Sequence, residues 1–152
     1  CRGTFTGLTF AHGKGDMIRS VMEGVALEIK SMIIGIEETI EQNVNLIRVT
    51  GGGAKSDFWN QIMADVFNKQ METIKCAEAT SLGAAMCAAV GHGAYKNLQE
   101  AAAQMVQVDK RFDPIPANVE IYAELFDLYN RFYNATTPDF FPGLNKFQSE
   151  RV

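Results

Sequence analysis

Three consecutive glycines, Gly51 to Gly53, form the part of this sequence that most favours ligand binding. They follow the β-branched run NLIRVT (45–50) and precede a segment in which Ser56 or Asp57 can cap a helix. Glycines let a ligand approach the backbone, and the N–H groups at a helix start favour anionic or polar ligand atoms. The pattern is typical of a nucleotide-binding turn, and equally of a glycine turn that only allows tight strand-to-helix packing. The motifs GxGxxG and GxxxxGK[ST] are both absent from the sequence.

Other polar residues give weaker indications of chemistry. Lys55 could reach a phosphate, although a solvated lysine at a helix start explains it more simply. His12 and His92 are far apart in glycine-rich loops with no carboxylate at ligand spacing, so no metal site is predicted. Glu23 and Glu28 lie on a predicted helix, where a packing or inter-element hydrogen bond is favoured over acid/base work.

The elements that would position these residues alternate between strands and helices. Apolar residues at steps of three or four predict helices over 16–43 (capped by Asp16), 57–67, 81–90, 98–106 and 119–133. Short strands are predicted over 4–10, with Gly7 as a bend, and over 45–50 and 71–75. Asp109 and Asp113 are interpreted as loop charges, and the chain from 141 onward as surface chain. The alternation predicts an α/β domain with a mostly parallel sheet.

Composition excludes some classes of function. The 152 residues are 47% apolar and 21% charged, with a formal net charge of −4, as in an ordinary globular protein. Lys and Arg form no stripe, so nucleic acid is not predicted as a ligand, and no apolar run is long enough to predict a membrane span. The three cysteines, Cys1, Cys76 and Cys87, contain no CxxC pair and indicate reduced thiols in a cytoplasmic protein.

Four segments resemble the FGGY family of carbohydrate kinases. TGGGAKSDFWNQIMADVF (50–67) resembles the family's adenosine motif, and RGTFTGL followed by DMIRSVMEGVALEI resembles the signature that precedes it. SLGAAMCAAVG (81–91) is similar to the connecting helix near the interdomain hinge. ELFDLYNRFYNATTPDF (124–140) resembles the tyrosine-rich last helix of xylulokinase-like members. The segments occur in the family's order and span nearly the whole chain.

The resemblance implies an actin-like ATPase (ribonuclease H-like) fold, with residues 1–152 as an incomplete C-terminal, nucleotide-binding domain. It implies that Gly51, Gly52, Gly53 and Ala54 lie against ATP or ADP, and that Mg²⁺ binds the phosphates rather than residues identifiable here. Asp57 stands where relatives often have an Asn that contacts adenine; a carboxylate cannot donate as an amide does, so Asp57 contacts the base or simply caps the helix. The catalytic base and the sugar site belong to regions of the family that these residues do not match.

The resemblance also leads to expectations about the chain as a whole. The first residue is Cys and the next read as mid-domain sequence, so the chain is expected to be a fragment that is inactive alone. Uncovered strand edges lead us to expect self-association, for example as a homodimer, or marginal stability. The alternatives are a non-catalytic nucleotide-binding or interaction module of the same fold, and a structural domain whose glycine turn binds nothing. The sugar is not readable from these residues.

Overall fold

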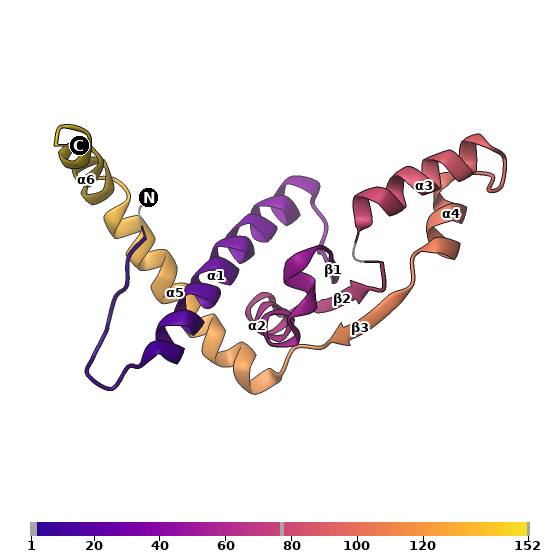
Figure 1. The fold of residues 1–152 in the computed structure, drawn as a ribbon. Coiled ribbons are helices and arrows are strands. Elements are labelled where there is room, and N and C mark those ends of the chain that lie inside the picture. Colours follow the sequence, from indigo (N-terminus) through magenta and orange to yellow (C-terminus); the bar gives the residue numbers. More distant parts are fainter. Residues whose placement is uncertain (1–2, 77, 152) are drawn as a thin grey trace.

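A computed structural model describes residues 3–76 and 78–151, and Cys1 therefore lies outside the described residues. The elements are, in chain order, α1 (Lys14–Ile40), β1 (Leu46–Val49), η1 (Gly52–Lys55), α2 (Asp57–Phe67), β2 (Gln70–Ile74), α3 (Ala79–Gly91), α4 (Leu98–Met105), β3 (Val108–Phe112), α5 (Pro116–Thr136) and α6 (Phe140–Ser149). Figure 1 shows a central body of sheet and helices with a helical arm on each side.

The sheet has the order β1-β2-β3. β1 and β2 are parallel, with Leu46 opposite Gln70, whereas β3 runs antiparallel to β2, with Met71 opposite Phe112. The sheet is therefore mixed, and the parallel pairing that was predicted is confined to its first two strands. Within the described residues, β1 has β2 as its one neighbour, and an apolar groove of about 350 Å³ lies between its open side and α1.

The core lies where α1 and α5 pack around α2 against the sheet. Its buried side chains are Ala26, Leu27, Ile62, Met63, Ala64, Val66, Phe67, Met71 and Tyr122. Helix α2 contributes the largest share because it lies between α1, α5 and the sheet, so every residue from Ile62 to Phe67 is buried. This packing holds α2, and with it the glycine turn that precedes α2, at the carboxyl end of β1.

Helices α3 and α4 form an arm that projects beyond the sheet (Figure 1). Its two ends meet at a neck, where the backbone N–H of Lys75 donates to the carbonyl of Gln107 at 2.9 Å. The Lys75 ammonium also donates to the Gln107 side chain at 3.3 Å. Although α3 is rich in apolar residues, none of its side chains is buried, so the arm presents an open apolar surface.

Three predictions about the elements were wrong. Thr4 to Phe10 form no strand, because a strand needs a ladder partner and the segment has none among the described residues; Gly7 is nevertheless a bend with φ +81°. Val108–Phe112 is a strand although Asp109 and its neighbours were interpreted as loop charges, since edge strands tolerate exposed charges. The third concerns Asp16, which does not cap α1: the helix begins at Lys14, and the Asp16 carboxylate accepts from the N–H of Gly13. The predicted surface chain is mostly exposed and contains α6, which is anchored by the buried Phe141.

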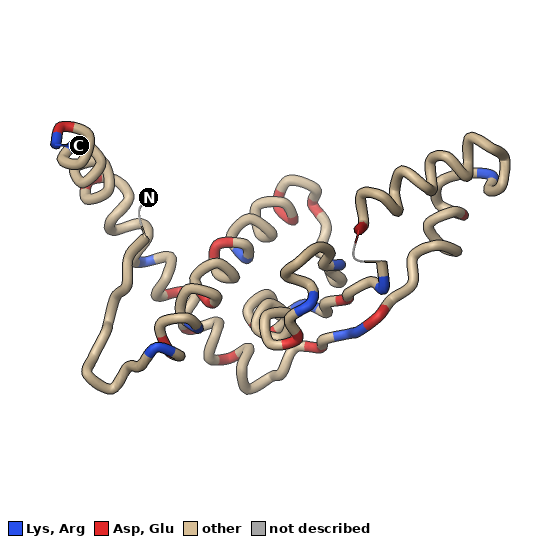
Figure 2. Tube along the Cα trace, in the orientation of Figure 1, with Lys and Arg blue, Asp and Glu red and all other residues tan. Residues whose placement is uncertain are grey.

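The charged residues are mixed in sign along the chain. Figure 2 shows Lys and Arg interspersed with Asp and Glu over α1 and across the sheet. Several oppositely charged pairs join different elements, including Glu37 of α1 with Lys69, and Glu72 of β2 with Arg48 and Arg111. Within the described part of the chain, none of the helices combines the length and the hydrophobicity that crossing a membrane requires.

Candidate functional site

The glycine turn lies exposed between β1 and α2. Gly51 adopts φ +84° and ψ −164°, a conformation that is essentially restricted to glycine. Residues Gly52–Lys55 then form the single 3-10 turn η1, in which the N–H of Ala54 donates to the carbonyl of Gly51 at 3.3 Å. Gly51, Gly52 and Gly53 are all exposed and Ala54 is part-exposed, so the backbone of the turn is accessible from solvent.

The local structure differs among the three glycine positions. Gly51 is required by its backbone angles. A Cβ at Gly53 would meet the Trp59 indole at 3.6 Å, an ordinary contact. A Cβ at Gly52 would meet nothing within 4 Å, and its φ lies outside the left-handed region. The packing of this chain therefore does not require glycine at position 52, where the open backbone can accept the close approach of a ligand.

Residues at the N-terminal end of helix α2 hold the glycine turn in place. The Ser56 hydroxyl caps the helix by accepting from the N–H of Trp59 at 3.2 Å. The side-chain amide of Asn60, which is fully buried, donates to the carbonyl of Ala54 at 2.8 Å. The turn is thus fixed both to the start of the helix and to its core-facing side.

Asp57 does not cap α2. Both of its carboxylate oxygens accept from the Lys110 ammonium of β3, at 2.7 and 2.8 Å, and the cap is Ser56. The hydrogen bond to Asp57 raises the pKa of Lys110. The helix-capping interpretation of Asp57 is therefore wrong. If the Asp57 carboxylate contacts a base, it must either do so while bound to Lys110 or release Lys110.

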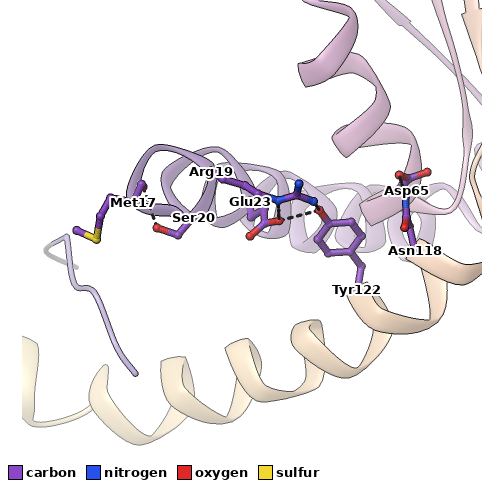
Figure 3. Close-up of polar contacts among 7 residues, drawn as sticks. All are labelled: Met17, Arg19, Ser20, Glu23, Asp65, Asn118 and Tyr122. Atoms are coloured by element: carbon purple, nitrogen blue, oxygen red, sulfur yellow. Dashed lines mark hydrogen bonds and ion pairs between the residues drawn. The ribbon is translucent and has the colours of Figure 1, made fainter. Parts of the chain in front are cut away.

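Glu23 takes part in an inter-element hydrogen-bond network, as the sequence favoured. The buried Tyr122 hydroxyl of α5 donates to Glu23 Oε1 at 2.8 Å, and Arg19 Nε donates to the same oxygen at 2.7 Å (Figure 3). Arg19 also donates to the Tyr122 oxygen at 3.1 Å. Burial, together with the hydrogen bond to Glu23, raises the pKa of Tyr122. This network joins α1 to α5, and its Arg19 also lies over the ring of Phe58 in α2, 5.7 Å from the centroid. Glu28 likewise hydrogen-bonds to Tyr129 of α5.

The other polar residues singled out in the sequence do not converge on the turn. Lys55 is exposed at the end of η1, and His12 Nδ1 accepts from the N–H of Thr9 at 2.8 Å in the segment before α1. Among residues 3–76 and 78–151, no group of three or more His, Cys, Asp and Glu side chains could hold a metal ion. The structure therefore brings Gly51 to Ala54 and Asp57 together at one place, and leaves the histidines elsewhere.

Three residues around the turn were not predicted from the sequence: Trp59, Asn60 and Lys110. A polar residue at a core-facing position of an amphipathic helix was a signal that could have singled out Asn60. Lys110 could not have been found without the strand β3, because its contact with Asp57 spans 53 positions of sequence.

A substitution at Gly51 should destabilise the fold more than the same change at Gly52. Gly51→Ala forces a side chain into a conformation that costs about 1–3 kcal/mol, whereas Gly52→Ala should stay within about 0.5 kcal/mol of the wild type. Thermal and urea unfolding of the two variants would measure the difference. Equal melting temperatures would show that the turn does not hold Gly51 at positive φ.

Comparison with known proteins assigns this sequence to a family. The profile of the FGGY family of carbohydrate kinases, C-terminal domain, matches residues 1–92, which include the glycine turn, α1, α2 and α3. The chain belongs to the FGGY family of carbohydrate kinases. Its sequence is 36% identical to the xylulose kinase of Staphylococcus epidermidis over 135 residues, which are 89% of this chain and 27% of that protein.

Solved structures of FGGY kinases have the same fold. The ligand-bound xylulose kinase from Lactobacillus acidophilus superposes with a TM-score of 0.80 at 33% identity, covering 92% of this chain and 28% of that one. The gluconate kinase from the same organism gives a TM-score of 0.79 at 32% identity, with the same coverage. The predicted actin-like fold class is thereby confirmed. The chain spans about a quarter of the length of the FGGY relatives it matches.

Proposed function

We propose that this chain is part of an ATP-dependent, xylulokinase-like sugar kinase and supplies the adenosine-binding side of its ATP site. The observation that carries the proposal is Gly52, whose exposed backbone is left open although neither its φ nor the packing of this chain requires glycine there. Membership of the FGGY family supports nucleotide as the ligand that approaches this backbone. A cytoplasmic location follows from the proposed use of ATP.

In this proposal, residues 51–54 lie against the nucleotide and Asp57, paired with Lys110, lies at the edge of the site. The glycines contribute close approach and backbone dipoles, and Ser56 and Asn60 keep the turn in place. Bound ATP would supply the γ-phosphoryl group for a sugar hydroxyl, with Mg²⁺ on its phosphates. The described residues offer no metal-binding cluster, so Mg²⁺ would arrive with the nucleotide.

The proposal assigns this chain a binding role and not the whole reaction. Phosphoryl transfer depends on positioning the sugar hydroxyl, its general base and the phosphates at once. The chain covers only about a quarter of its relatives, and we propose that alone it forms no sugar phosphate. A related proposal concerns association: the open side of β1 and the apolar surface of α3 favour self-association, for example as a homodimer.

Nucleotide titration tests the binding role. We expect the chain to bind ADP and Mg-ATP with a Kd of about 0.1–1 mM, and Gly52→Val to weaken binding at least tenfold without lowering the melting temperature. Calorimetry gives the affinity, and the fluorescence of Trp59, the one tryptophan of the sequence, gives a second signal next to the turn.

Gly143→Ala in α6 is the matched control, since that glycine also has no atom within 4 Å of its missing Cβ and lies far from the turn in sequence. It should leave the affinity unchanged and should not lower the melting temperature, because alanine favours a helix over glycine. Absence of nucleotide binding by the wild-type chain, or equal binding by Gly52→Val, would contradict the proposed role of the turn.

A further inference from the structure

Asn60 holds the glycine turn through a hydrogen bond from its buried side chain. It lies on α2 one helical turn after Ser56, and none of its surface is exposed. Its Nδ2 group donates to the carbonyl of Ala54 at 2.8 Å, and its backbone N–H donates to the carbonyl of Ser56 at 3.0 Å.

Stability alone does not explain an amide at position 60. Its Oδ1 atom is buried and has no hydrogen-bond partner among the described residues. A buried acceptor without a partner is unfavourable, and an apolar side chain of similar volume would avoid that cost. The neighbouring inward residues of the same helix, Ile62, Met63 and Val66, are apolar. What Asn60 provides, and an apolar residue could not, is the N–H that reaches Ala54.

The turn needs such a contact because it is otherwise exposed. Gly51, Gly52 and Gly53 have no side chains with which to pack, and the built Cβ positions of the first two meet no atom within 4 Å. Glycine-rich segments lose more conformational freedom on ordering than others. A bond from the rigid core of α2 to the carbonyl of Ala54 therefore restricts the turn before any ligand arrives, which reduces the entropic cost of binding.

We propose that Asn60 is a positioning residue of the nucleotide site, which acts by fixing the turn at residues 51–55 through Ala54 and does not touch the ligand. This inference rests on the proposed function, in which that turn lies against the nucleotide. One buried side chain of α2 would thus fix the conformation of the turn.

The test measures affinity and local backbone protection in the same variants. Asn60→Leu keeps the branched shape and the number of heavy atoms of the side chain while removing both the N–H that reaches Ala54 and the unpartnered Oδ1. We expect its Kd for ADP to rise at least tenfold, and amide hydrogen exchange to accelerate at the N–H groups of Ala54 and Ser56. Exchange in the core-facing part of α2, from Ile62 to Val66, should keep its wild-type rate.

Gln61→Leu is the matched control. Gln61 is the next residue on α2, and its amide donates to Asp65 at 2.8 Å and to the carbonyl of Asp113 at 3.0 Å, away from the turn. Its loss removes hydrogen bonds from the same helix, yet should leave the ADP affinity and the exchange of the turn unchanged. Asn60→Ala, which adds no volume, replaces Asn60→Leu if the leucine variant does not melt cooperatively.

The outcomes separate this inference from the proposed function. If the wild-type chain binds no nucleotide, the proposed function fails, and with it the role of Asn60 in nucleotide binding, whatever the exchange rates show. If the wild-type chain binds ADP, the inference is overturned by an unchanged Kd in Asn60→Leu, or by a weaker Kd without faster exchange at Ala54 and Ser56. Weaker binding together with faster exchange confined to the turn would support it.

Discussion

Asp65→Ala should lower the free energy of unfolding by about 3–5 kcal/mol, the largest effect expected of a single substitution in this chain. Asp65 is 3% exposed and accepts three hydrogen bonds. Its Oδ1 atom accepts from Gln61 and from the N–H of Ile115, both at 2.8 Å, and its Oδ2 atom accepts from Asn118 at 2.7 Å. Alanine would leave the Ile115 N–H and the Asn118 amide without this acceptor, would leave Gln61 only its bond to the Asp113 carbonyl, and would open a cavity between α2 and α5.

Urea unfolding followed by far-ultraviolet circular dichroism would measure this loss. Asp127→Ala is the control, because Asp127 forms only an exposed pair with Arg131 at 3.8 Å and its removal should cost less than about 1 kcal/mol. Figure 3 shows Asp65 and Asn118 facing one another at the start of α5. If both variants unfolded at similar urea concentrations, Asp65 would not anchor the start of α5 to α2.

Acidification should unfold the chain cooperatively between about pH 5 and pH 3. The hydrogen bond from Lys69 and that from the N–H of Val44 lower the pKa of Glu37. The hydrogen bond from Arg48, with a second from Arg111, lowers the pKa of the buried Glu72. Both carboxyl groups thus have a lower pKa in the folded chain than in the unfolded chain, where 4.5 is the ordinary value.

The sign of the effect follows from proton binding. The unfolded chain binds more protons than the folded chain near these pKa values, so the stabilisation is complete above about pH 5 and is lost as the pH falls through the folded-state values. Melting temperatures between pH 3 and pH 8 would show a plateau and then a steep fall on the acid side. The double variant Glu37→Gln, Glu72→Gln should melt lower at pH 7 and show a shallower fall.

Exposed carboxylates should contribute little to the acid transition. Glu150→Gln removes an exposed carboxylate that lies 3.9 Å from Lys146, and this variant should retain the wild-type pH dependence. If the double variant kept the full acid transition, the ion pairs of α1 and of the sheet would not be its source.

Local signals in the sequence were sufficient to predict the elements around the glycine turn. The apolar spacing of α1 and α2, the Ser56 cap and the glycines after β1 each depend on residues that are close together in the chain. The strand β3 could not be predicted in this way, because VDKRF has charged residues at its centre and is a strand only through pairing with β2. The segment 4–10 shows the opposite case, in which β-favouring residues pair with no strand among the described residues.

The details of the candidate site depended on contacts that sequence spacing does not reveal. Asp57 had two local interpretations, as a cap and as a base contact, and the structure replaced the first with a pair to Lys110. Asn60 lies within the segment that resembles the adenosine motif but was not singled out, since its role depends on the distance from its amide to the carbonyl of Ala54. The sequence therefore predicted where the turn is, whereas the structure was needed to identify what holds it.

The neck at Lys75 and Gln107 brings the two ends of the α3–α4 arm together. Because its entry and exit are neighbouring ends of β2 and β3, the arm could lengthen or shorten by whole helical turns without shifting the register of the sheet. The glycine turn follows β1, on the other side of β2 from β3, so the turn and the arm leave the sheet from different strands.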